Sequence, residues 1–129
     1  MTNSQHVYRI IFLLAGTYNL AFAIWLVAAP ASLFGLINIS IPFSENYILP
    51  LAIGIALYVP IYIFAILHPE KAKKGIGFCL LSKIGTLFLA CILILAAGWP
   101  VALLKMVFFN DVIWWIPFFL FLRKNNTGI

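Results

Sequence analysis

Charged side chains are scarce in this sequence. Of the 129 residues, eight are Lys or Arg and three are Asp or Glu, so that only 9% are charged, against about 25% in an average soluble domain. Hydrophobic residues make up 65% of the chain. A soluble domain of this size leaves roughly a third of its chain surface in water, which so few polar side chains cannot cover. The composition therefore excludes a soluble globular domain, a disordered chain and a nucleic-acid-binding protein.

Cysteine and histidine are scarce too. The two cysteines, Cys79 and Cys91, lie in one hydrophobic run, where twelve residues of helix would separate them by about 18 Å, too far for a disulfide. No Cys-x-x-Cys or His–Cys pair is present, so we expect no thiol-redox or metal site. His6 and His68 flank hydrophobic runs rather than lying inside them, which argues against a mid-membrane haem.

What the sequence does contain is four long hydrophobic runs, each near the ~20 residues that a membrane-spanning helix needs. They cover residues 7–29, 47–67, 75–97 and 103–122. Pro50 and Pro60 fall inside the second run, where they predict a kink, and Pro117 falls inside the fourth run, which is expected to be kinked or partly broken. The loops are short and no internal repeat is visible. The sequence therefore predicts one all-α domain, residues 1–129, that forms an integral membrane four-helix bundle of up-down-up-down topology.

Residues 30–46, between the first two runs, differ from the runs in composition. Pro30, Gly35 and Pro42 interrupt a mildly apolar stretch that is too short to span. Such a segment suits the membrane surface or a re-entrant position. We expect it to lie at the outer surface, between helices 1 and 2.

Basic residues are distributed unevenly between the two ends of the predicted spans. The end with both termini carries Arg9, Lys71, Lys73, Lys74, Arg123 and Lys124, and the opposite end carries only Lys105. Because cytoplasmic loops are enriched in Lys and Arg, both termini are predicted to be cytoplasmic.

Four polar residues inside the spans form the candidate site: Asn19, Tyr58, Lys83 and Asp111. A helix rise of 1.5 Å per residue places all four within a slab ~5 Å thick near the middle of a ~30 Å hydrocarbon core. A secondary set was chosen from their neighbours and from aromatic or amide groups nearby: Tyr18, Tyr62, Thr86, Asn110, Trp114 and Trp115.

The polar set has three interpretations. The residues lock the helices in register, or Lys83 snorkels to the interface while Asp111 lies in a wet funnel, or they form a ligand-binding or proton-handling site. On the third span, small and polar residues recur at helical spacing with Lys83, which favours an inward-facing position.

Three stretches resemble small bacterial four-helix membrane proteins of the DoxX-like type. They are Tyr18-Asn19, Lys83-Ile84-Gly85 and the distinctive Asn-Asp-x-Ile-Trp-Trp-x-Pro-Phe stretch of residues 110–118. The resemblance implies a multi-pass protein of the bacterial inner (plasma) membrane and an association with membrane redox complexes and quinone chemistry. It carries over no functional residue.

Several functions remain open at this stage. The first is an accessory or scaffold subunit of a larger membrane complex, or a homo-oligomer in the lipid bilayer. The second is a binder of a lipophilic molecule of quinone or isoprenoid type, and the third is a DoxX-like oxidoreductase subunit. A proton-coupled transporter is the weakest, because the chain shows no repeat symmetry.

Overall fold

The computed structural model describes residues 3–126, with side chains to residue 124, and all of its regular structure in that range is helical. In chain order the elements are α1 (Asn3–Ala28), α2 (Pro30–Gly35), the 3-10 turn η1 (Glu45–Tyr47), α3 (Ile48–Ala56), α4 (Tyr58–Leu67), α5 (Lys73–Ala97), α6 (Leu103–Asn110), the 3-10 turn η2 (Val112–Trp114) and α7 (Trp115–Asn126).

Four helical segments are long and apolar enough to cross a membrane. They are Asn3–Ala28, Glu45–Leu67, Lys73–Ala97 and Leu103–Lys124. Each coincides with one predicted run, although the first and third helices begin two to four residues earlier than the sequence indicated, since polar residues continue the helix beyond its apolar part. The third ends at Gly98, whose φ of 69° is the left-handed conformation that commonly terminates a helix.

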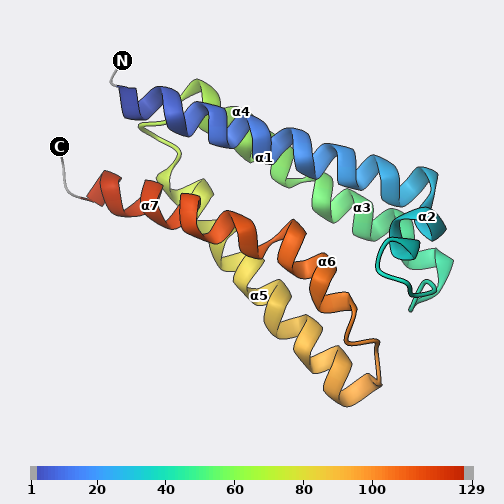
Figure 1. The fold of residues 1–129 in the computed structure, drawn as a ribbon. Helices are drawn as coiled ribbons and strands as arrows, with labels where there is room; N and C mark the ends of the chain where they lie inside the picture. The colour runs from blue at the N-terminus through green and yellow to red at the C-terminus, as the bar shows by residue number, and fades with distance from the viewer. Residues whose placement is uncertain (1–2, 127–129) are drawn as a thin grey trace.

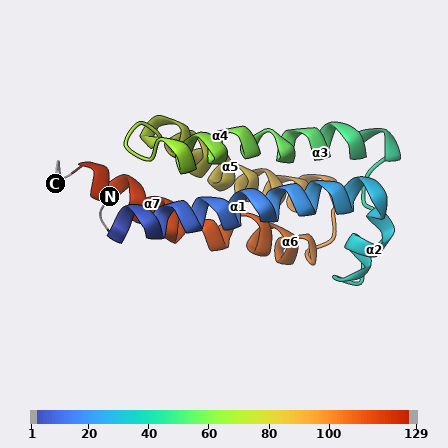
Figure 2. The same cartoon turned by 90° about the horizontal axis from the view of Figure 1, so that it is seen from above.

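The long helices form two layers that are inclined to each other (Figures 1 and 2). In one layer α1 packs along α3 and α4, and in the other α5 packs along α6 and α7. The layers meet at the end that carries both termini, where α4 packs on α5, and they diverge toward the opposite end, as Figure 1 shows.

An aromatic core holds the layers together near the termini. Phe12 on α1 packs against Phe118 and Phe121 on α7, with ring centroids 5.9 and 4.9 Å apart. Phe12 is 0% exposed. Tyr62 on α4 joins the same cluster, 5.6 Å from Phe118. This end of the molecule is therefore closed by packing.

Two of the four long segments are interrupted, each a few residues before a proline. Pro60 and Pro117 have no backbone N–H, so the carbonyl four residues earlier loses its helical partner. The second segment breaks at Leu57, between α3 and α4, and the fourth breaks at Asp111, between α6 and η2. The kinked or broken helices predicted from these prolines are thus present.

The segment of residues 30–46 contributes to the core at the diverging end. It contains α2 and then a loop, and Leu33 and Phe34 of α2 are buried. Phe34 packs against Phe43, which packs against Trp99 in the turn after α5, with centroids 5.6 and 5.9 Å apart. One side of this segment therefore covers the end of the bundle, whereas Leu36 is 66% exposed.

Candidate functional site

Lys83 lies at the centre of the polar residues, on the buried face of α5. Its side chain is 0% exposed, although it carries a charge. The ammonium Nζ donates to Asp111 Oδ1 at 3.1 Å and to the backbone carbonyl of Asn110 at 3.3 Å, and it lies 5.0 Å from the centre of the Tyr58 ring. Two oxygen acceptors and one ring face thus surround the ammonium, because the face of an aromatic ring also attracts a cation. This geometry contradicts the snorkelling interpretation.

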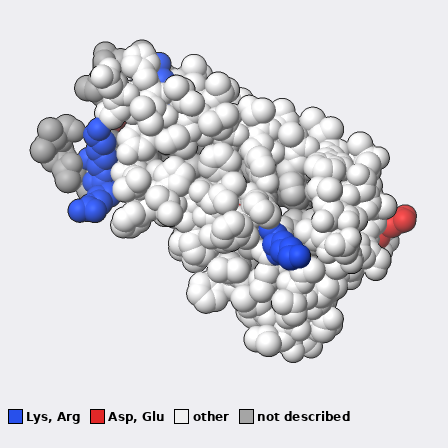
Figure 3. Space-filling model, in the orientation of Figure 1, with Lys and Arg blue, Asp and Glu red and all other residues white. Residues whose placement is uncertain are grey.

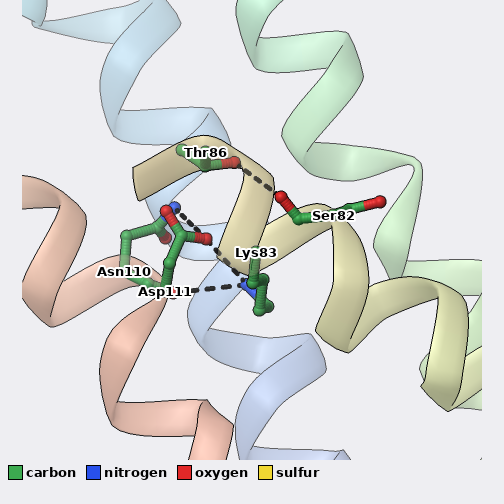
Figure 4. A network of polar contacts seen from close by, with 5 residues as sticks. All are labelled: Ser82, Lys83, Thr86, Asn110 and Asp111. Carbon is green, nitrogen blue, oxygen red and sulfur yellow. Dashed lines mark hydrogen bonds and ion pairs between the residues drawn. The ribbon is translucent and has the colours of Figure 1, made fainter. Parts of the chain in front are cut away.

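The break in the fourth segment creates the acceptors that surround the ammonium (Figure 4). The last carbonyls of a helix have no partner within it and form its negative end. Asn110 closes α6, so its carbonyl is one of these groups. Asp111, the next residue, is 4% exposed and presents its carboxylate to Lys83. A helix break and a buried carboxylate therefore neutralise the same cation.

The Asn110 side chain supports the carboxylate from the other side. Its Nδ2 lies 3.5 Å from Asp111 Oδ1, and this long hydrogen bond orients the amide because an oxygen in its place would face another oxygen. The amide Oδ1 is buried and has no hydrogen-bond partner among the described residues. Both donors that reach the carboxylate, Lys83 and Asn110, end on Oδ1, so Oδ2 retains its capacity to accept.

A large apolar cavity ends on these polar groups. It occupies about 770 Å³ between α3, α5 and α6, in the half of the molecule where the layers diverge. Tyr58, Thr86, Asn110 and Asp111 line its inner end. Its other walls are almost wholly apolar, formed by Phe22, Phe34, Phe43, Tyr47, Pro50, Leu51, Gly54, Ile55, Leu89, Ala90, Leu93, Trp99, Leu103, Met106 and Val107.

Asn19 is buried apart from the ion pair. It is 1% exposed, and neither side-chain polar atom has a hydrogen-bond partner in the part of the chain that the structure describes. It lies one turn from Gly16, which packs against Tyr62, and one turn from Phe22, which lines the cavity. Asn19 therefore lies on the inward face of α1, as predicted, but no direct contact joins it to Lys83 or Asp111 among the described interactions.

The secondary residues divide between the site and its surroundings. Thr86 lines the cavity, and its hydroxyl donates to the Ser82 carbonyl at 3.0 Å. Tyr62 stacks on Tyr58 with ring centroids 6.3 Å apart. Tyr18 contacts Trp114 edge to face at 6.0 Å, which packs α1 on the break beside Asp111.

Trp115 belongs to a different surface. It lines a shallow apolar groove with Leu80 and Ile84 on α5 and with Ile116, Phe119 and Leu120 on α7. Among the described residues, no group of three His, Cys, Asp or Glu side chains is placed to hold a metal ion.

Sequence reasoning missed the cavity and most of its lining. The predicted residues Tyr58, Thr86, Asn110 and Asp111 lie at its polar end, but the residues of its apolar walls were not predicted. Two of the wall residues, Gly54 and Ala90, are small, and small residues at helical spacing are the one signal in the sequence that indicates such a wall.

Comparison of the chain with known protein families, with curated proteins and with solved structures found no match.

Proposed function

We propose that this protein spans the membrane four times and binds a lipophilic small molecule in the cavity between α3, α5 and α6. The observation that carries the proposal is the cavity itself, which joins a long apolar wall to a buried polar end. Ligand sites characteristically have volumes of about 300–1,000 Å³, apolar walls and a few polar groups that orient the ligand. An amphiphile with a small headgroup matches this arrangement, and quinones and isoprenoids are the classes considered from the sequence.

The distribution of exposed side chains supports the membrane part of the proposal. The surface between the ends is almost free of charge, and large hydrophobic side chains such as Leu81, Phe88 and Leu95 are 70%, 66% and 86% exposed. Figure 3 shows basic side chains gathered at the end with the termini, a basic side chain over α6, and an acidic one at the far end. A lipid-facing surface has this pattern, because charges are costly in hydrocarbon and favourable at its boundaries.

The proposal places both termini in the cytoplasm of a cell whose plasma membrane holds the protein, in up-down-up-down topology. A reporter that is active only outside the cytoplasm should give no signal when fused to Ile129. The same reporter inserted within residues 43–46 should give one, because the basic end stays inside. The reversed pattern of signals would overturn this orientation.

The cavity then lies in the outer half of the membrane, with its polar end near the middle. The layers diverge on this side and only at this side (Figure 1). A lipophilic molecule could enter between them directly from the surrounding lipid, with its headgroup foremost, and reach Tyr58 and Asp111.

Filling the cavity tests the proposal. Gly54 lines the cavity, and a Cβ added there meets no atom within 4 Å, so Gly54→Leu should occupy the space without displacing the fold. Gly85 is the matched control, since its added Cβ also meets no atom within 4 Å, but it lies outside the cavity lining. Extracted in lipid-containing particles, wild type and Gly85→Leu should retain a stoichiometric amphiphile by mass spectrometry, and Gly54→Leu should lose most of it.

Two results would contradict the binding proposal. One is equal retention of the amphiphile by Gly54→Leu and wild type, with both folded by thermal melting. The other is a wild-type protein that carries only bulk lipid and co-purifies instead with a stoichiometric protein partner, as an accessory subunit of a membrane complex would.

A further inference from the structure

The polar end of the cavity presents a charged hydrogen-bond acceptor with unused capacity, the Oδ2 oxygen of Asp111. The Lys83 ammonium is the strongest donor present, and it already donates to Asp111 Oδ1 and to the Asn110 carbonyl and lies over the Tyr58 ring. The Thr86 hydroxyl donates its one proton to the Ser82 carbonyl. Thr86 keeps lone pairs that can accept, and Asp111 keeps Oδ2.

The net charge of this end is also decisive. Lys83 and Asp111 form a buried pair whose formal charges cancel, so the end offers no excess positive charge to a carboxylate or phosphate. The charged atom with capacity remaining is the Oδ2 oxygen of Asp111, and an anion placed there would be repelled. A headgroup that only accepts would leave this oxygen without a hydrogen-bond partner between apolar walls, which is unfavourable.

We propose that the cavity selects amphiphiles whose uncharged headgroup carries a hydroxyl, which donates to Asp111 Oδ2 and accepts a hydrogen bond from the Tyr58 phenol. A hydroxyl fits because it donates one hydrogen bond and accepts others, and the Tyr58 phenol beside it can do the same. The inference rests on the proposed function, and it names the headgroup chemistry rather than the presence of a ligand. A long-chain alcohol and a hydroquinone share that chemistry.

A direct competition tests the inference. Wild-type protein in lipid nanodiscs is given equimolar farnesol and farnesyl methyl ether, which differ only in whether the headgroup oxygen carries a proton. Native mass spectrometry then measures the ratio of the two bound species. A hydrogen bond to a charged acceptor is worth enough to favour the alcohol by about tenfold. Farnesoic acid, ionised at neutral pH, should be excluded.

A second pair of probes distinguishes the sources of the hydroxyl. Decyl-ubiquinol and decyl-ubiquinone have the same chain, but only the reduced form donates. Preference for farnesol over its ether with no binding of either decyl compound identifies a lipid alcohol as the ligand class. Preference for the quinol over the quinone, with weaker binding of farnesol, identifies a hydroquinone. Either result supports the inference.

Variants separate this inference from the function on which it rests. Gly54→Leu should bind neither farnesol nor its ether, because both need the cavity. The double change Lys83→Met/Asp111→Asn should bind both with a selectivity reduced severalfold, because a neutral amide accepts less strongly than a carboxylate. Equal binding of alcohol and ether by wild type, or undiminished selectivity in the double variant, overturns the headgroup inference and leaves cavity binding intact. No binding of any probe overturns both.

Discussion

Replacing Lys83 with Met is expected to lower the stability of the fold by about 3–5 kcal/mol, because it leaves the buried Asp111 carboxylate without its counter-charge. Asp111→Asn should cost a similar amount by stranding the ammonium. Both residues are nearly inaccessible, at 0% and 4% exposure, so the charge left without its partner stays largely buried. Thermal melting in mild detergent, followed by tryptophan fluorescence, measures the loss.

The double variant Lys83→Met/Asp111→Asn is the control for this prediction. Removing both charges eliminates the attraction between Lys83 and Asp111, but it also eliminates the cost of burying the two charged groups. Most of the stability lost in the single variants should therefore return. Losses that simply add in the double variant would show that the 3.1 Å contact between Nζ and Oδ1 contributes no coupling energy. Single variants that melt like wild type would mean that the ion pair does not form in the protein.

The second large effect is expected at Phe12. Phe12→Ala removes the ring that packs on Phe118 and Phe121 and leaves a void where α1 meets α7. We expect a loss of about 2–3 kcal/mol, below the ~3–5 typical of soluble cores, because lipid solvates a Phe ring as well as the protein interior does and only the packing term remains. Thermal melting again provides the measurement.

The matched control is Phe88→Ala on α5. Phe88 is 66% exposed, whereas Phe12 is 0% exposed, so the same chemical change should alter stability little. Equal destabilisation by the two substitutions would contradict the packing described here, because it would mean that the exposed Phe88 ring makes as many stabilising contacts as the buried Phe12 ring.

The positions of the four candidate site residues were predicted only in part from the sequence. Counting helix rise placed Lys83 and Asp111 at a common level, and the structure joins them. The same count placed Asn19 and Tyr58 at that level. Tyr58 contributes its ring face to the ammonium, but Asn19 packs on the inward side of α1 without joining the pair. The depth of a residue along its helix follows from its residue number. The direction in which its side chain points around the helix, and the distance between neighbouring helices at that depth, do not follow from the residue number.

The sequence by itself determined the four hydrophobic segments, their breaks and the charge asymmetry of the ends. Segment length, proline position and charge are local properties, and each follows from a few neighbouring residues. Only the tertiary structure decided that α3 diverges from α5 and α6, that α2 packs back over the end, and that a cavity of about 770 Å³ opens onto Asp111. Those features depend on contacts between residues far apart in the chain, such as Phe43 with Trp99. In an almost uniformly apolar sequence, hydrophobicity does not distinguish a side chain that faces lipid from one that lines a cavity, so packing alone makes that distinction.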